Sequence, residues 1–283
     1  MKKEAGIRKG RIFNAPFSVQ GKAALLVLLV VFPIFSSTFI LEEQKSFAAS
    51  APMRLMVLAS PSDPVIGPIL QSFMKYPTDM DWGHARYFPT LTAVTGGTSL
   101  SLVRNAAENA PSSQAKVIAY DFEHWSLTPV TEQSDPVNSA NKAASLVHSL
   151  GLKFMFVPDG GYMYDLHNGV PFYKLYNWTN FDYLNLQVQT HRFAGGGDGT
   201  NVASFVANVQ NVVSYAKSQH PGIIVFVQLS LRYDSPLTII QKTQAISNIS
   251  DGITYHYNID HMLCANCTPS NLQTVLHSLR PNF

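Results

Sequence analysis

The sequence predicts a parallel α/β barrel of the (β/α)8 type, and three observations lead to this fold class. Strand-like apolar runs alternate with helical patterns from Met53 onward, which is typical of parallel sheets built from strand–helix–strand units. Seven such runs fall within about 230 residues, close to the usual length of a TIM barrel, about 250 residues. The turn after the first run, Ser60–Pro64, lacks the glycines of an open doubly wound sheet, which is the main alternative.

Strands are expected where apolar, β-branched and aromatic residues run together. In chain order they are Arg54–Ala59, Phe88–Val94, Lys116–Glu123, Lys153–Val157, Tyr183–Gln189, Ile223–Leu231 and Gly252–Tyr257. A complete barrel needs eight strands. Either the eighth strand lies between Pro77 and Gly97, or the barrel is incomplete with irregular early strands.

Helices are expected where apolar residues recur every three or four positions. They are Pro64–Tyr76, Leu100–Ala110, Asn138–Leu150, Asn201–Ser218, a segment after Ser235 and Pro236, and Ser270–Leu279. Gly151 follows the third of these, and glycine ends helices readily because it tolerates a positive φ.

Residues 1–49 are expected to be a signal peptide or an N-terminal membrane anchor, and residues 50–283 the barrel domain. Ala23–Leu41 is a nearly charge-free apolar run behind a basic stretch. It lies between the about 7–15 residues of a signal-peptide core and the about 20 residues of a membrane span. Ser46–Ala48 has the small-x-small character of a cleavage site. The basic residues place the body outside the cell, either secreted or tethered to the outer face of the membrane by this segment alone.

The charge of the body argues against a nucleic-acid partner. The 283-residue chain carries 20 Lys and Arg against 18 Asp and Glu. Seven of these basic residues and three of the acidic ones precede Ser50, which leaves a weakly acidic body. Such a body lacks the cation cluster that neutralises phosphates.

Functional side chains of parallel barrels lie at the carboxyl ends of the strands, where this sequence places polar and aromatic residues. The candidates are Asp121, Glu123, Trp125, Asp159, Gln187, Gln189, Gln228, Tyr233, Asp234 and Tyr255. Carboxylates, amides and aromatic rings with few cations suit a neutral, hydroxyl-rich ligand. A carbohydrate is therefore the expected ligand or substrate. Trp125 is either a platform for a sugar ring or ordinary packing.

Asp121 and Glu123 form the sharpest chemical signal. Residues two apart on a strand point the same way, so both carboxyl groups are expected to face one pocket. Two close carboxylates resist ionising together, which raises one pKa and provides a proton donor near neutral pH. The alternative is that the pair binds backbone amides or an arginine at the end of the strand.

The segment Lys116–Glu123 resembles the end of the strand motif D-x-x-D-x-D-x-E of chitinase-type glycoside hydrolases, which are TIM barrels. Asp121 and Glu123 match its last two acidic positions, whereas Lys116 and Ala119 stand at the first two. The resemblance implies that Glu123 is the catalytic acid and that Asp121 orients an acetamido group of the substrate.

Leu231–Asp234 is similar to the later M-x-Y-D strand end of the same family, with Leu in place of Met. The family's buried tryptophan on the last strand has no counterpart here. The segment from Tyr120 to Pro136 and the glutamine-bearing strands also resemble secreted barrels related to glycoside hydrolases. The expected function is thus a glycoside hydrolase acting on a neutral or N-acetylated glycan, and the alternative is a non-catalytic carbohydrate-binding barrel.

Cys264 and Cys267 are expected to form a local disulfide, because thiols of exported proteins are oxidised. With His261, a metal site is the weaker alternative, since no fourth ligand is evident. The sequence Gly195–Gly199 lacks the Gly-Lys-Ser/Thr of a phosphate loop, and the histidines show no His-Glu-x-x-His pattern. No cofactor and no metal are therefore expected, and the protein is expected to be a monomer.

Overall fold

The computed structural model describes residues 53–83, 86–188, 201–257 and 264–280. The chain divides into two units, Met1–Ser50 and Ala51–Phe283, and every described residue belongs to the second. The predicted leader, residues 1–49, lies outside the described residues. Within the described residues, no helix is long and apolar enough to cross a bilayer.

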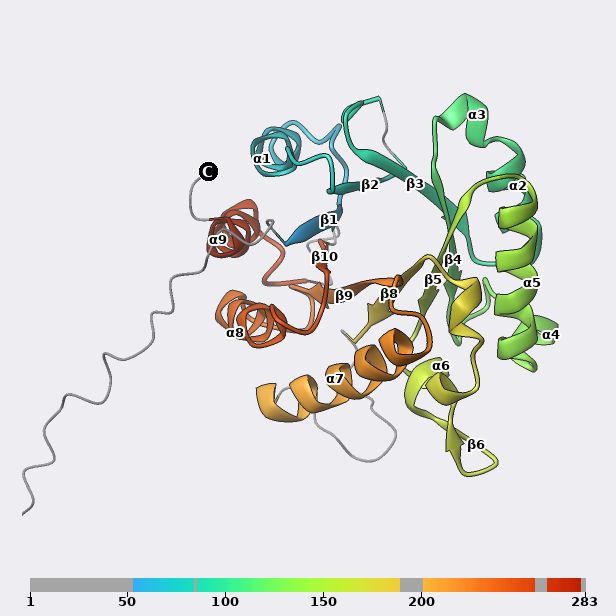
Figure 1. The fold of residues 1–283 in the computed structure, drawn as a ribbon. Coiled ribbons are helices and arrows are strands. Elements are labelled where there is room, and N and C mark those ends of the chain that lie inside the picture. The colour runs from blue at the N-terminus through green and yellow to red at the C-terminus, as the bar shows by residue number, and fades with distance from the viewer. Residues whose placement is uncertain (1–52, 84–85, 189–200, 258–263, 281–283) are drawn as a thin grey trace, which may run out of the picture. The chain divides into compact units, whose positions relative to one another are not determined.

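Eight parallel strands close into a barrel (Figure 1). They are β1 (Arg54–Leu58), β2 (Met80–Trp82), β3 (Thr92–Gly97), β4 (Val117–Phe122), β5 (Lys153–Pro158), β8 (Tyr183–Gln187), β9 (Ile224–Ser230) and β10 (Gly252–His256). Around the barrel the order is β1–β10–β9–β8–β5–β4–β3–β2, and β2 pairs with β1. The fold is therefore the predicted (β/α)8 TIM barrel. An open doubly wound sheet would have two unpaired edge strands. The pairing of β1 with β2 closes the sheet and excludes that fold.

The eighth strand, β2, lies between Pro77 and Gly97. This confirms the first of the two alternatives. It has only three residues, too few to produce a periodic signal. The predicted strand Phe88–Val94 was placed too early, because the paired segment is β3, Thr92–Gly97. No helix is formed by the described residues between β2 and β3, so the early strands are irregular.

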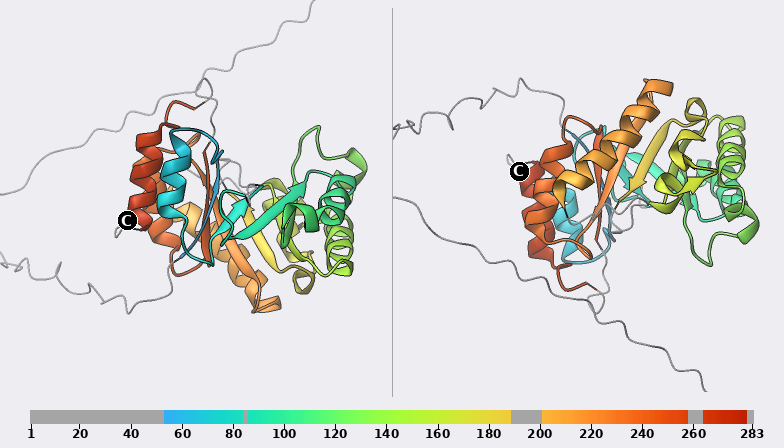
Figure 2. Two further views of the ribbon diagram at one scale, coloured as in Figure 1. Left: turned by 90° about the horizontal axis from the view of Figure 1, so that it is seen from above. Right: turned by 90° about the horizontal axis from the view of Figure 1, so that it is seen from below.

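Helices cover the outside of the barrel in both views of Figure 2. They are α1 (Ile66–Phe73), α2 (Leu100–Glu108), α3 (Ala110–Ser113), α4 (Val130–Gln133), α5 (Pro136–Ser149), α6 (Gly161–Tyr164), α7 (Val202–Gln219), α8 (Pro236–Ile246) and α9 (Pro269–Leu279). Each of the six predicted helices is present within a few residues of its expected bounds. Gly151 has a φ of 72° after the end of α5, as predicted.

The insertion after β5 was not predicted. It contains α6, the antiparallel hairpin β6 (Leu166–His167) and β7 (Val170–Pro171), and the 3₁₀ turns η1 (Phe172–Lys174) and η2 (Trp178–Asn180). These elements have two to four residues each, too few for a helix or strand pattern to repeat along the sequence.

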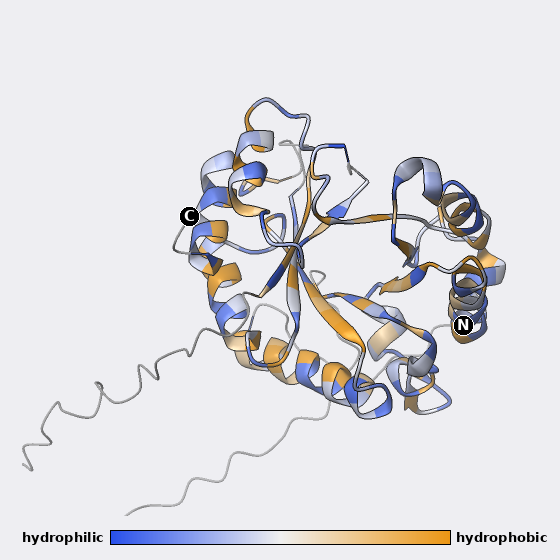
Figure 3. Cartoon of the chain, turned by 45° about the horizontal axis from the view of Figure 1, so that its top comes forward, coloured by the Kyte–Doolittle hydropathy of each residue, from blue (hydrophilic) through white to orange (hydrophobic). Residues whose placement is uncertain are grey.

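Apolar side chains form two layers. A small cluster fills the barrel interior and includes Met56, Ala119, Met155 and Phe226. A larger cluster lies between the strands and the surrounding helices. In Figure 3 the helices alternate between hydrophilic and hydrophobic colours along their length, as expected for helices that pack one face on a barrel. Burial in both layers leaves the ends of the strands as the place for polar side chains.

Candidate functional site

The carboxyl end of β4 places both acidic candidates toward the barrel axis. Ala119 belongs to the interior cluster, so Asp121, two residues further, points the same way. Glu123 follows directly after the last residue of the strand. Asp121 and Glu123 are each partly exposed.

Gln187, at the end of β8, joins the two carboxyl groups. Its Nε2 donates to Asp121 Oδ1 at 2.8 Å and to Glu123 Oε1 at 3.0 Å. Gln187 is buried and lies on the inner face of β8. One amide thus holds both carboxyl groups together across two strands that are not adjacent in the barrel.

Both acidic groups resist ionisation. Burial raises the pKa of Asp121 to about 8, and the charge of Glu123 and a hydrogen bond with it act in the same direction. Burial also raises the pKa of Glu123, aided by the charge of Asp159, although hydrogen bonds from Gln187 and Asp121 oppose this rise. The pair therefore retains a proton at neutral pH, which is the condition for an acid catalyst.

Asp159, at the end of β5, is engaged by the loop after β4. Its Oδ2 accepts from the His124 backbone N–H at 2.7 Å and lies 2.8 Å from His124 Nδ1. Its Oδ1 accepts from the Tyr162 N–H at 3.1 Å. The His124 ring stacks on Tyr162 with centroids 3.7 Å apart, and a Cβ at Gly161 would lie 2.7 Å from His124 Cε1. Asp159 therefore orients the rim of the site.

Trp125 lies in the loop between β4 and α4 and is partly exposed. Its indole N–H donates to Thr128 Oγ1 at 2.9 Å, and its carbonyl accepts from Gln133 Nε2 at 2.7 Å. The Glu123 backbone N–H reaches the same Thr128 hydroxyl at 3.4 Å. The indole is thus fixed close to Glu123.

Gln228 and Tyr255 lie on opposite faces of the barrel wall. Gln228 points inward, is buried, and accepts from Asn185 Nδ2 at 2.7 Å. Tyr255 points outward toward α8, where its hydroxyl lies 3.0 Å from Thr243 Oγ1. The expectation that Tyr255 lines the site was wrong, because its neighbour His256 is the residue on the inner face.

Asp234 does not line the site either. Its Oδ2 accepts from Lys242 Nζ at 2.7 Å, and both side chains are nearly completely buried. This ion pair fixes the start of α8, so the prediction of a substrate contact was wrong. Tyr233 lies under the Arg232 guanidinium, 5.4 Å from the ring centroid. Gln189, the remaining candidate, lies outside the described residues, as does His261.

Four inward-facing residues were not among the predicted site residues. They are Trp82, Asn185, Thr254 and His256, on β2, β8 and β10. Strands of a parallel barrel are buried on both faces, so the alternation that marks an inner face is weak. A Cβ added at Gly252 would collide with the Phe226 ring in the barrel interior, so position 252 faces inward. Thr254 and His256, two and four residues later, therefore face inward as well.

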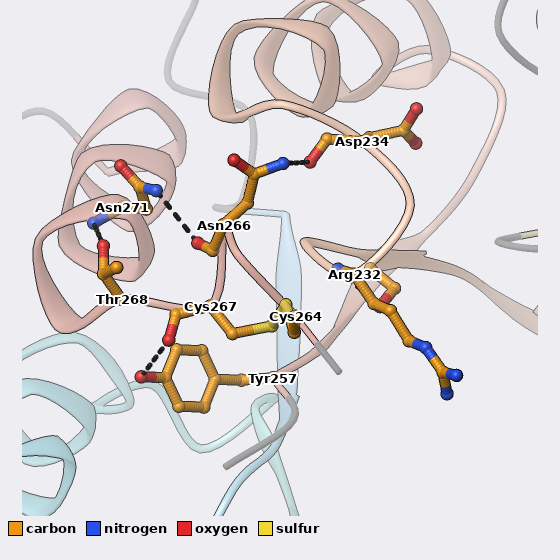
Figure 4. The surroundings of a disulfide bond; sticks show 9 residues. Arg232, Asp234, Tyr257, Cys264, Asn266, Cys267, Thr268 and Asn271 are labelled. Carbon is orange, nitrogen blue, oxygen red and sulfur yellow. Dashed lines mark hydrogen bonds between the residues drawn. A yellow bond between two sulfur atoms is a disulfide. The ribbon is translucent and has the colours of Figure 1, made fainter. Parts of the chain in front are cut away.

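The cysteines form a disulfide in the connection from β10 to α9 (Figure 4). Cys264 and Cys267 are buried, with Cα atoms 5.3 Å apart. The Tyr257 hydroxyl donates to the Cys267 carbonyl at 3.0 Å. Asn266 Nδ2 donates to the Asp234 carbonyl at 3.3 Å. The loop thereby connects the end of β10 with the start of α8.

Among the described residues, no group of three acidic, histidine or cysteine side chains is placed to hold a metal ion. A cavity of about 580 Å³ lies away from the carboxylates, between the loop before β3 and helices α2 and α3. Its wall includes Leu91, Ala107, Ala110 and Leu152, with Lys116 from the chain just before β4. It lies outside the barrel, where the β2–β3 connection has no helix among its described residues.

Comparison with known proteins shows the fold. No family model matches the sequence, and no curated protein matches it. Similar solved structures include a GH18 chitinase from Pseudoalteromonas aurantia, 12% identical, covering 72% of this chain and 93% of that chain with a TM-score of 0.49. The spore cortex-lytic enzyme SleL of Bacillus megaterium QM B1551 is 10% identical, covering 80% of this chain and 73% of that chain with a TM-score of 0.50. D-psicose 3-epimerase of Clostridium cellulolyticum H10 is 11% identical, covering 80% of this chain and 96% of that chain with a TM-score of 0.47.

These three structures are 10–12% identical to this chain. At such identities the likeness extends to the barrel alone, because one barrel fold supports many reactions. The chemistry of this protein is therefore argued from its own site.

Proposed function

We propose that this protein is a glycoside hydrolase-like enzyme that acts on a neutral or N-acetylated glycan. The observation that carries the proposal is the Asp121–Glu123 pair, which faces the barrel axis and retains a proton. The resemblance of Lys116–Glu123 to the chitinase-type motif supports the same roles. Trp125 and Trp82 supply aromatic surface near the strand ends, where a sugar ring can stack.

In the proposed reaction, Glu123 donates its proton to the leaving oxygen as the glycosidic bond breaks. A water molecule forms the new bond to the anomeric carbon and returns a proton to the carboxyl pair. Asp121 carries the shared proton in the resting pair and passes it to Glu123 before the glycosidic bond breaks. Asp121 also orients the substrate. Gln187 keeps both carboxyl groups in one place, so that the proton can pass between them without rearrangement.

The test is Glu123→Gln, which keeps the shape of the side chain and removes the acidic proton. We expect turnover of a responsive glycan to fall by about 10²–10⁴-fold, with binding of the same glycan nearly unchanged. Glu108→Gln, on the exposed face of α2, is the matched control and should behave as wild type. Equal hydrolysis by wild type and Glu123→Gln contradicts the assignment.

One observation favours a second function, a non-catalytic carbohydrate-binding barrel. Asp159 is held by His124 and Tyr162, and Asp234 is paired with Lys242. Neither is free to serve as a second catalytic carboxylate opposite Glu123. A hydrolysis and binding screen over a glycan panel separates the two functions, since the binding barrel retains glycans and releases no product.

We also propose that the barrel is exported, on the basis of the apolar run Ala23–Leu41 and the basic residues before it. The mass of the protein recovered from the medium and from the membrane fraction distinguishes cleavage near Ala48 from a retained anchor.

A further inference from the structure

Polar side chains line the inner faces of three neighbouring strands, β8, β9 and β10. In the strand register Thr254 lies beside Gln228, and Gln228 lies beside Gln187. His256 lies beside Ser230 in the next inward row. Register neighbours in a sheet point to the same face, so this wall faces the barrel axis.

Three atoms of this wall are buried without a hydrogen-bond partner. They are Asn185 Oδ1, Thr254 Oγ1 and His256 Nδ1. Asn185 and Thr254 are each 0% exposed, whereas His256 is partly exposed. A buried polar atom without a partner costs free energy, and three of them on β8 and β10, the two strands that flank β9, indicate a site for a polar ligand.

The β10 part of this wall lies opposite the carboxylates. Four steps around the eight-stranded barrel, β10–β9–β8–β5–β4, separate the strand of His256 from that of Asp121. Both residues point inward at the carboxyl ends of their strands, and both are partly exposed. A ligand that contacts Asp121 and Glu123 on one side thus has His256 on the other.

The charge state of His256 defines the kind of ligand. Burial and the charge of Arg232 lower its pKa, so the imidazole is neutral at pH 7. Its register neighbours, Leu58 on β1 and Ser230 on β9, are uncharged. A neutral imidazole offers one donor and one acceptor, which suits a hydroxyl group.

We propose that His256, Thr254 and Asn185 form a second wall of the substrate site and hydrogen-bond the hydroxyl groups of an uncharged sugar ring held against Asp121 and Glu123. This inference rests on the proposed function for the class of ligand. The inference assigns a substrate-contacting role to β10 and β8. The proposed catalysis by Asp121 and Glu123 does not by itself require that role.

The test measures binding of tri-N-acetylchitotriose and cellotriose by calorimetry to the full chain. We expect His256→Leu to weaken the binding of the trisaccharide that wild type binds by about three- to tenfold, the loss of one hydrogen bond. His256→Gln, which keeps a donor and an acceptor, should restore part of the affinity. His167→Gln, on the exposed β6 strand, is the matched control and should bind as wild type does.

Thr254→Val gives an independent readout. Removing an unpartnered hydroxyl should leave the melting temperature of the free protein equal or higher, while trisaccharide binding weakens. A lower melting temperature with unchanged binding shows that the hydroxyl serves the fold and overturns its role in the site.

The outcomes separate this inference from the proposed function. Equal affinities in wild type and His256→Leu overturn the inference, even where Glu123→Gln abolishes hydrolysis. Weaker binding in His256→Leu supports it, even where wild type hydrolyses neither trisaccharide and the enzymatic proposal fails. Failure of wild type to bind either trisaccharide overturns both.

Discussion

At the scale of single residues, Asp121 and Glu123 derive their chemistry from their surroundings. An aspartate ordinarily ionises near pH 4, yet burial and a second carboxyl group raise the pKa of Asp121 to about 8. Gln187 supplies the opposing influence, because its amide donates to both groups and favours their ionised forms. One buried side chain from a second strand, β8, therefore adjusts the pKa values of the pair.

Asp121→Asn should change how stability depends on pH. A raised folded pKa means that the native state binds more protons than the unfolded state between about pH 4 and pH 8. The free energy of unfolding of wild type should therefore fall as pH rises through this window, more steeply than that of Asp121→Asn. Urea unfolding at several pH values measures the difference. Parallel curves for the two proteins would show that Asp121 ionises normally.

At the scale of elements, one arrangement recurs at the amino ends of three strands. Asp79, Asp182 and Asp251 each directly precede a strand, β2, β8 and β10. Each accepts a backbone N–H from the neighbouring strand that comes before it in the chain, at 2.8–3.0 Å, from Leu55, Phe154 and Val225 respectively. Lys153, His148 and Lys217 add side-chain contacts to two of them. These aspartates fix the register at the end of the barrel opposite the site.

Asp182→Asn tests this arrangement. Burial opposes ionisation of Asp182, but hydrogen bonds from Lys153, the Phe154 N–H and His148 outweigh it and lower the pKa. Its contribution to stability is then present above about pH 4 and lost as pH falls through the folded pKa. We expect Asp182→Asn to cost about 1–3 kcal/mol at pH 7, measured by urea unfolding.

The difference in the free energy of unfolding between wild type and Asp182→Asn should become smaller as the pH is lowered below about 4. Asp165→Asn, at an exposed position before β6, is the control and should leave the unfolding curve unchanged. A gap that is the same at pH 3 and pH 7 would contradict the role assigned to the charge.

The Cys264–Cys267 disulfide connects elements rather than closing a long loop. Only two residues separate the cysteines, so little entropy is removed from the unfolded chain. Replacing both with serine should therefore cost about 2 kcal/mol or less, measured by thermal unfolding. Non-reducing mass spectrometry of the protein should show no free thiol. Two free thiols would contradict the bridge, and zinc that survives dialysis would favour the metal alternative.

At the scale of the whole molecule, a buried ion pair links the first and the last part of the barrel domain. The Arg280 guanidinium, after α9, binds both carboxylate oxygens of Asp79, 201 residues earlier, at 2.5 and 2.8 Å. Its side chain also donates to the Phe73 and Met53 carbonyls and lies over the Tyr76 ring. The pair holds the last helix against β1 and β2, where the barrel closes.

Arg280→Met should destabilise the fold by about 3–5 kcal/mol, because it leaves the buried Asp79 charge without its partner. The double variant Asp79→Asn, Arg280→Met should recover part of the loss, since no isolated charge remains. Arg104→Met, at an exposed position on α2, is the matched control. Urea unfolding measures all four proteins. A loss below about 1 kcal/mol in Arg280→Met would place the pair among ordinary surface salt bridges.

Part of the site could be predicted because it depends on local sequence. Asp121 and Glu123 are two residues apart at the end of an apolar strand, so their shared direction follows from strand geometry. Tyr255 and Asp234 were assigned wrongly for a different reason. Their surroundings are set by α8, through Thr243 and Lys242, and no spacing in the strand sequence shows which way the strand faces.

The sequence by itself determined the barrel class, the helices and the position of the carboxylate pair, because hydrophobic periodicity and strand ends are local properties of the chain. The short strand β2, the inward direction of His256 and the pairing of Arg280 with Asp79 were decided only by the tertiary structure. Closing a barrel brings residues from opposite ends of the chain together, and strands buried on both faces carry little alternation to show which side chains face the axis.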